Sequence, residues 1–244
     1  MNNLGMFWGI GVGPGPKGYI PLAAVEALQQ ADLVYAPRAH SSETSVALQC
    51  LAGIDLAQEK IREIEFTMDP DRSVLSEHYT ALAKTIAVEL RAGRNVAYLT
   101  IGDSLTYSTY GYLLAALREY CPDFLHRTFP GITSYAAAAS ALGWPLGVGK
   151  ERSLILPCPE NATELRQDIE SHDIVVLMKI GARLPWVLAL LNEMGIAEHC
   201  AFARRIGLDE ELLADNVSAL CATSSMGYLA TLLIRKTPRE KRHT

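Results

Sequence analysis

Apolar runs of strand length alternate with amphipathic helical patterns along most of this chain. Residues 6–12 and 96–101 are the clearest apolar runs, and residues 73–92 carry the longest helical pattern, which ends at Gly93. Short apolar strands between amphipathic helices are typical of sheets that are covered by helices on both faces. The pattern therefore predicts an α/β protein with a mostly parallel first sheet.

The remaining elements follow from the same periodicities and from glycine and proline signals. In the first half we expect further strands at 32–35 and 125–129 and helices from Leu22, from Ser108 to Tyr120 and from Ser134 to near 143. In the second half we expect strands at 153–156, 174–178, 197–203, 217–222 and 228–235, and helices from about 163 and at 183–194. The last two strands are too close for a crossover helix, so they predict antiparallel pairing and a mixed second sheet.

The glycine-rich segment 143–149 interrupts this alternation, so we place a domain boundary there. The prediction is an N-terminal α/β domain at 1–143, containing the first glycine loop and the Gly102-Asp103 pair, and a mixed α/β domain at 144–244. The tail from Thr237 to Thr244 is expected to be disordered.

Composition narrows the class of protein. A hydrophobic fraction of 49% excludes a disordered chain, and a formal net charge of −5 offers no basic surface for nucleic acid. The five cysteines contain no CxxC pair and the six histidines no HExxH motif, so reduced thiols and no metal site are expected. No secretion signal and no apolar run of membrane-spanning length is apparent. We therefore expect a cytoplasmic enzyme without membrane or nucleic-acid partners.

The segment from Tyr98 to Tyr110 is the most informative in the chain, because an apolar strand ends in Gly102, Asp103 and a crowd of hydroxyls. One helix start uses only one or two capping side chains, so the surplus polar groups indicate a ligand. Ligands of open α/β sheets bind at the carboxyl ends of the strands. Asp103 suits either a general base or a group that orients a ligand.

Two further loops are expected at the same sheet edge. Gly13 to Gly18 matches GxGxxG after a strand, but Pro14 and Pro16 lack the amide hydrogens that bind a pyrophosphate. An NADP site is one alternative, because Arg38 could bind the 2′-phosphate. A glycine–proline turn with a purely structural role is another. The third loop is Pro130-Gly-Ile-Thr-Ser134, which opens a helix. Ser104 lies outside any GxSxG elbow, so a serine hydrolase is not indicated.

Together, Gly11-Val-Gly-Pro-Gly15, Tyr98-Leu-Thr-Ile-Gly-Asp103, Tyr107-Ser-Thr109 and Pro130-Gly-Ile-Thr-Ser134 resemble the tetrapyrrole methylases of cobalamin and sirohaem biosynthesis. The resemblance runs nearly from end to end. It is strongest to the precorrin-2 or cobalt-factor-II C-20 methyltransferases, through Tyr107 to Leu113 and the alanine-rich helix. The family usually has Asp after GVGPG and proline after Gly-Asp, where this chain has Pro16 and Ser104.

The resemblance implies a dimeric class III methyltransferase with two α/β domains that binds S-adenosylmethionine between them and methylates carbon 20 of a tetrapyrrole. The implied catalytic residues are Gly13, Pro14, Gly15 and Asp103. The implied cofactor residues are Ile101, Gly102, Asp103, Thr106, Tyr107, Ser108, Thr133, Ser134, Met178, Ile180, Arg205, Ile206, Leu208, Ala230 and Thr231. No metal or covalent nucleophile is needed, because the sulfonium already activates the methyl group.

A tetrapyrrole carries many carboxylates, so basic side chains are expected around it despite the acidic net charge. The candidates are Lys17, Arg38, His40, Lys150 and Arg204. Other methylases of the same fold remain alternatives, acting on uroporphyrinogen III, another precorrin, a diphthamide intermediate or ribosomal RNA. From other classes, an NADP-binding oxidoreductase and a non-catalytic tetrapyrrole carrier remain.

Overall fold

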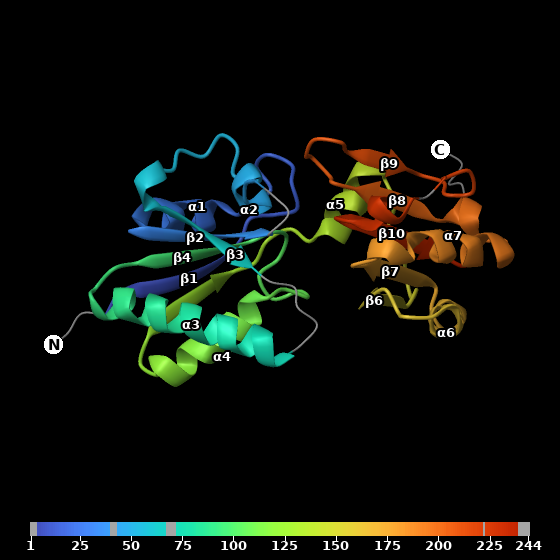
Figure 1. Ribbon diagram of the computed structural model, residues 1–244. Helices are drawn as coiled ribbons and strands as arrows, with labels where there is room; N and C mark the ends of the chain where they lie inside the picture. Colours follow the sequence, from blue (N-terminus) through green and yellow to red (C-terminus); the bar gives the residue numbers. More distant parts are fainter. Residues whose placement is uncertain (1–3, 40–42, 67–71, 222, 239–244) are drawn as a thin grey trace. The chain divides into compact units, whose positions relative to one another are not determined.

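The computed structural model describes residues 4–39, 43–66, 72–221 and 223–238. The chain divides into two compact units, Met1–Thr133 and Ser134–Thr244 (Figure 1). This division precedes the segment 143–149, because the helix Ser134–Ala141 (α5) packs against the strand Ala230–Arg235 (β10) of the second unit. The boundary at 143, as the limit of an independent domain, stays a prediction.

The first unit contains a wholly parallel sheet in the order β3-β2-β4-β1-β5. Its strands are β1 (Met6–Gly11), β2 (Leu33–Ala39), β3 (Ile61–Phe66), β4 (Val96–Thr100) and β5 (Leu125–Phe129). In the ladder, Phe7 is opposite both Val96 and His126. The central β1 and β4 are apolar and almost entirely buried, as strands covered on both faces should be.

Within the described residues of this unit, four α-helices and one short 3-10 turn accompany the sheet. They are α1 (Leu22–Gln30), α2 (Val46–Gln49), η1 (Gln58–Lys60), α3 (Arg72–Arg91) and α4 (Tyr110–Tyr120). In Figure 1, α3 and α4 run together along one face of the sheet, whereas α1 and α2 lie on the other. Helix α3 ends where Gly93 adopts a positive φ of 78°, the C-terminal glycine that the sequence predicts.

The core of the first unit lies under α3 and α4 and is rich in aromatic rings. Phe7 stacks on Tyr110 with centroids 6.1 Å apart, and Tyr98 packs against the same ring at 6.2 Å. Gly9 makes this possible, because a Cβ at that position would overlap the Tyr110 ring. The buried Tyr110 hydroxyl shares a 2.8 Å hydrogen bond with Thr128 Oγ1. Tyr110 of α4 therefore packs on β1 and β4 and is hydrogen-bonded to β5.

The second unit contains a mixed sheet in the order β6-β7-β10-β8-β9. Its strands are β6 (Ser153–Pro157), β7 (Ile174–Met178), β8 (Ala201–Arg204), β9 (Leu212–Ala214) and β10 (Ala230–Arg235). Strands β6 and β7 are parallel, and β10 runs antiparallel to both β7 and β8. The predicted combination of a parallel first sheet and a mixed second sheet is confirmed.

The helical elements of this unit are α5, α6 (Ala162–Ser171), η2 (Gly181–Arg183), α7 (Leu184–Glu193), η3 (Ala197–His199) and η4 (Ser224–Gly227). Helices α6 and α7 bury Leu165, Ile169 and a row of α7 residues against β7 and β10. Asn161 caps α6, because its Oδ1 accepts a 2.9 Å hydrogen bond from the Glu164 amide.

The glycine-rich segment 143–149 is fixed to the second unit at both ends. Glu151, just beyond it, forms a two-pronged ion pair with the buried Arg235 of β10. The Arg235 guanidinium lies 5.4 Å from the centroid of the buried Trp144 ring. Ser153 Oγ also donates a 2.5 Å hydrogen bond to Leu146 O. The segment is therefore an ordered part of this unit.

Several predicted elements need correction. The strand expected at 217–222 is wrong, because residues 217–221 form a turn and β10 finds its antiparallel partners in β7 and β8. The strand expected from 197 begins only at Ala201, since residues 197–199 form η3. The elements α2, β3 and β9 were not predicted. Of the tail predicted as disordered, residues 239–244 lie outside the described residues.

Candidate functional site

Three loops at the carboxyl ends of β1, β4 and β5 meet within the first unit. Gly13 N–H donates to Gly102 O at 3.1 Å, and Gly102 N–H donates to Gly13 O at 2.7 Å. A Cβ on Gly11 or on Gly131 would collide with the backbone of a neighbouring loop. Glycine at positions 11 and 131 permits this approach, whereas glycine at positions 13 and 102 suits their positive φ angles of 82° and 71°.

Asp103 holds two of these loops together through three side-chain hydrogen bonds. Its Oδ1 accepts from Thr106 Oγ1 at 2.8 Å and from the Leu105 amide at 3.0 Å. Its Oδ2 accepts from the Gly131 amide at 3.1 Å. The carboxylate therefore folds its own loop and ties it to the turn after β5.

These contacts favour the ionised form of the Asp103 carboxyl group. Partial burial raises the pKa, but the hydrogen bonds from Thr106, Leu105 and Gly131 together outweigh it and lower the pKa below its ordinary value. A carboxylate with a lowered pKa stays ionised at neutral pH and is a weak proton acceptor. Of the two roles that the sequence left open, the geometry favours orientation.

The hydroxyl residues after Asp103 have separate structural tasks. Ser104 is fully buried and its Oγ donates to Phe129 O at 3.0 Å, which explains a serine at this position. Ser108 Oγ accepts from the Tyr110 amide at 3.0 Å at the start of α4. Tyr107 has a φ of 51°, a left-handed conformation that is uncommon outside glycine.

Two features of the β4 end indicate a ligand. Gly102 has a φ of 71°, and a Cβ placed there would meet only Ile132 O, at 3.9 Å. Thr100 is buried, and its Oγ1 has no hydrogen-bond partner among the residues that the structure describes. A buried hydroxyl without a partner is costly, so it indicates a group or water that binds there.

The remaining predicted cofactor residues lie at one edge of the second sheet. Strands β7 and β8 end there and β10 begins there, since both pair antiparallel with β10. Lys179, Arg205 and Leu229, the residues next to these strand ends, all have a positive φ between 51° and 52°. Strained backbone of this kind clusters at functional sites.

Helix α5 begins at the same edge. Ser134 Oγ shares a 3.0 Å hydrogen bond with Thr231 Oγ1, which places the first residue of α5 beside the start of β10. Arg205 N–H donates to Leu229 O at 3.0 Å, and Ile206 and Ile180 are buried. The structure therefore brings together Ser134, Met178, Ile180, Arg205, Ile206, Leu208, Ala230 and Thr231 within the second unit.

The sequence model of the tetrapyrrole (corrin/porphyrin) methylases matches residues 6–220. The chain belongs to this family. A tetrapyrrole methylase is a methyltransferase, and the two α/β units with a parallel and a mixed sheet agree with that membership.

Named relatives match this methylase over nearly their whole length. The cobalt-precorrin-2 C(20)-methyltransferase of Salmonella typhimurium is 28% identical, covering 95% of this chain and 97% of the relative. A probable cobalt-precorrin-2 C(20)-methyltransferase of Methanocaldococcus jannaschii is 32% identical, covering 95% and 96%. The crystal structure of the methyltransferase CobJ shares the fold, with a TM-score of 0.66, 21% identity and coverage of 95% and 94%.

The basic residues proposed for the tetrapyrrole have different surroundings in this methylase. Lys17 is exposed and lies over Gly53, and Arg38 pairs with Glu63 at 3.7 Å. Arg204 pairs with Glu210 at 3.3 Å at the candidate edge of the second sheet. Lys150 precedes β6 and so lies toward the opposite edge of that sheet. His40 lies outside the described residues.

In unit 1, the predicted residues Pro14 and Gly15 are buried beside the Gly13–Gly102 contact, and Ile101 and Thr133 flank the loops just described. Sequence reasoning missed the Gly131 amide, whose signal is its place in the Pro-Gly turn after β5. No helix in the described part of the chain is long and apolar enough to cross a membrane.

Proposed function

We propose that this methylase transfers a methyl group from S-adenosylmethionine to carbon 20 of precorrin-2 or its cobalt-bound form, in cobalamin biosynthesis. The proposal rests on the end-to-end match to two relatives that carry the cobalt-precorrin-2 C(20)-methyltransferase name. The cobalt ion, where present, belongs to the substrate.

The described residues suit S-adenosylmethionine. The open side of Gly102 allows a ligand close to the backbone, and the Thr100 hydroxyl lacks a hydrogen-bond partner among the described residues. Backbone groups and hydroxyls match the hydrogen-bonding groups of an amino acid and a ribose. We assign Ile101, Gly102, Asp103, Thr106, Tyr107, Ser108 and Thr133 of the first unit, and the eight residues at the second sheet's edge, to the cofactor.

S-adenosylmethionine supplies an activated methyl group on a sulfonium. The protein's task is then to hold the electron-rich ring carbon in line with that methyl and to exclude competing geometries. Asp103 fixes the loop that carries the Ile101 and Gly102 carbonyls, which would stabilise the positive charge of the sulfonium. On the substrate side, Gly13, Pro14 and Gly15 form the surface toward the tetrapyrrole. The methylated carbon then loses a proton to water, since the lowered pKa of Asp103 makes that carboxylate a poor acceptor.

We assign the tetrapyrrole carboxylates to Lys17, Arg38, His40, Lys150 and Arg204, by charge. Arg204 is the best supported of these, because its Nε is buried without a hydrogen-bond partner among the described residues. It also ends β8 directly before Arg205 and Ile206. Lys150 is the least supported, since it lies toward the other edge of the sheet.

The test is methyl transfer from labelled S-adenosylmethionine to precorrin-2 and to cobalt-precorrin-2, with the product's methylation site found by NMR. We expect one added methyl at carbon 20 and no turnover of uroporphyrinogen III. Methylation of uroporphyrinogen III alone, or at another carbon of the precorrin, would contradict the proposed substrate. Comparing the turnover of the two precorrins shows whether the enzyme prefers the metal-free or the cobalt-bound substrate.

An NADP-binding oxidoreductase is disfavoured by the first glycine loop. The Gly13 amide is already donated to Gly102, and Pro14 and Pro16 have no amide hydrogen to offer to a phosphate. The homodimer and the cytoplasmic location expected from the sequence stay predictions. Sedimentation of the purified protein tests the first.

A further inference from the structure

The turn after β7 carries two of the proposed cofactor residues in a strained backbone. Lys179 has a φ of 51° and Gly181 a φ of 56°, so left-handed residues stand on both sides of Ile180. Met178 and Ile180 are the residues that we assign to the adenine. A non-glycine residue in this conformation persists only when its surroundings hold it there.

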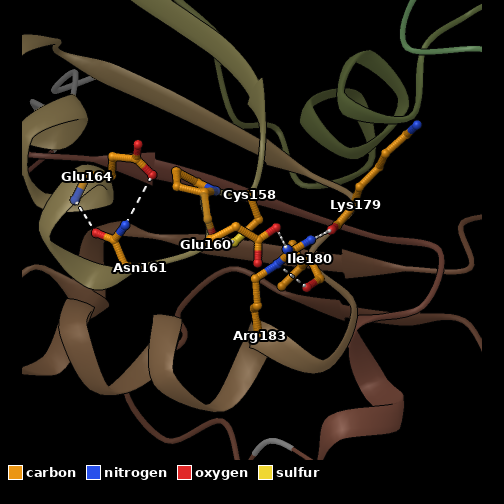
Figure 2. Close-up of polar contacts among 8 residues, drawn as sticks. Cys158, Glu160, Asn161, Glu164, Lys179, Ile180 and Arg183 are labelled. Atoms are coloured by element: carbon orange, nitrogen blue, oxygen red, sulfur yellow. Dashed lines mark hydrogen bonds and ion pairs between the residues drawn. The ribbon is translucent and has the colours of Figure 1, made fainter. Parts of the chain in front are cut away.

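Arg183 supplies one half of that support. Its Nη2 donates to Lys179 O at 2.9 Å and its Nε donates to Ile180 O at 3.3 Å. Its Nη1 pairs with the Glu160 carboxylate. Figure 2 shows the guanidinium among Glu160, Lys179 and Ile180, with the Lys179 side chain directed away from it. The planar fork of an arginine is needed to reach two carbonyls and a carboxylate at once.

Gly227 supplies the other half. The 3-10 turn η4 packs against η2, and a Cβ on Gly227 would overlap the backbone of Gly181. Because η4 leads through Leu229 into Ala230 and Thr231, this contact also joins the turn to the start of β10. The end of β6 is tied in as well, since the Cys158 amide donates to Met178 O at 2.8 Å.

We propose that Arg183 is a positioning residue for S-adenosylmethionine. It holds the Lys179–Gly181 turn against Gly227, so that Met178 and Ile180 keep the placement that the cofactor requires. The inference rests on the proposed function, because it needs the adenine to lie at this turn. Arg183 acts through the two carbonyls and the carboxylate that it binds.

The first test compares Arg183→Gln and Arg183→Lys with Arg166→Gln. Arg166 is a fair control, because it forms a 2.6 Å ion pair with Glu193 of α7 and contacts no turn carbonyl. We expect the dissociation constant of S-adenosylhomocysteine, measured by calorimetry, to rise about tenfold in Arg183→Gln, since hydrogen bonds from a charged group are lost. Lysine should restore part of the affinity, and Arg166→Gln should bind like the wild type.

The KM values for the two substrates distinguish a positioning role of Arg183 from a general role in folding. The KM for the tetrapyrrole and the melting temperature should change little in Arg183→Gln, while the KM for S-adenosylmethionine rises. Gly227→Ala should also raise the KM for S-adenosylmethionine and leave that for the tetrapyrrole little changed, but its melting temperature should fall, because its Cβ would overlap the Gly181 backbone. The control Gly147→Ala should do neither, because its Cβ would meet only Ser153 Oγ, at 3.6 Å.

Unchanged cofactor affinity in Arg183→Gln, beside a wild type that binds, would overturn the positioning role alone. An equal loss of affinity for cofactor and tetrapyrrole, with a lowered melting temperature, would overturn it too, in favour of a structural role. If Arg183→Gln does not fold, Arg183→Lys decides by the same measurements. A wild type that binds no S-adenosylhomocysteine would overturn the proposed function and this inference with it.

Discussion

At the scale of single residues, Asp103 shows how a polar side chain at a strand end can hold two loops in place. Its sequence context indicated a site but left base and orienting group equally open. The three hydrogen bonds decide between them, and the deciding partner, the Gly131 amide, lies 28 residues away. Such a contact has no local sequence signal. The sequence thus indicated this part of the candidate site, whereas the contacts that favour an orienting role are visible only in the structure.

Replacing Asp103 by Asn should reduce methyl transfer at least tenfold and lower the free energy of unfolding by about 1–2 kcal/mol at pH 7, because charge-assisted hydrogen bonds are lost. The folded-state pKa is lowered from 3.8, so this stabilisation is full above that value and disappears as the pH falls through the lower folded pKa. Urea unfolding between pH 7 and pH 3 tests this. A difference between variant and wild type that grows on acidification would contradict it.

The thiols give a second prediction at this scale. Burial raises the pKa of Cys50 and of Cys200 to about 12 and also raises that of Cys158, whereas Cys221 is exposed. Thiolate is the reactive form, so at pH 8 a disulfide reagent should label Cys221 rapidly and leave the buried thiols intact. The five thiols should all react in denaturant. Rapid labelling of the native Cys221→Ser variant would contradict this.

At the scale of elements, long and strongly patterned segments could be predicted and short or polar ones could not. Strands 125–129 and 174–178 have the bounds that the sequence predicts. Strand β3, by contrast, is an edge strand with exposed charged residues, and β9 has three residues. Neither carries a hydrophobic period long enough to detect. The strand expected at 217–222 is wrong, because Val217 is buried within a turn in which its carbonyl accepts a hydrogen bond from the Leu220 amide.

The ion pair that joins the 143–149 segment to β10 should be important for stability. Glu151→Gln leaves the Arg235 guanidinium, whose side chain is 6% exposed, without its counter-charge. We expect the free energy of unfolding to fall by about 1–2 kcal/mol, less than for a fully buried pair because Glu151 is partly exposed. Glu193→Gln, which breaks a surface pair, is the matched control and should change it by less than about 0.5 kcal/mol. Equal effects in both variants would contradict the expectation.

At the scale of the whole molecule, the chain consists of two units with separate cores that each gather proposed cofactor residues at one sheet edge. The architecture was predictable because strand and helix periods alternate from one end to the other. The backbone strain at Lys179, Arg205 and Leu229 was not, since ordinary residues adopt it only under tertiary constraint.

A ligand that binds only the folded protein should raise its stability. S-adenosylhomocysteine at about 100 times its dissociation constant should add about 2.7 kcal/mol, equivalent to a rise in melting temperature of roughly 5–10 °C. NADP at the same concentration should add nothing, because the first glycine loop has no free amide of Gly13 to offer. Thermal denaturation followed by circular dichroism tests both. Stabilisation by NADP alone would contradict the proposed function.

On the ribosome, β1 leaves the exit tunnel long before the strands on either side of it exist. Its neighbours begin at Val96 and Leu125, so at about 5–20 residues per second the apolar β1 waits roughly 5–20 s for its first ladder partner. An unpaired strand edge is prone to pair with other chains. Slower synthesis between β1 and β4 should therefore increase aggregation during synthesis, whereas slow codons reached after β4 and β5 have both left the tunnel should not.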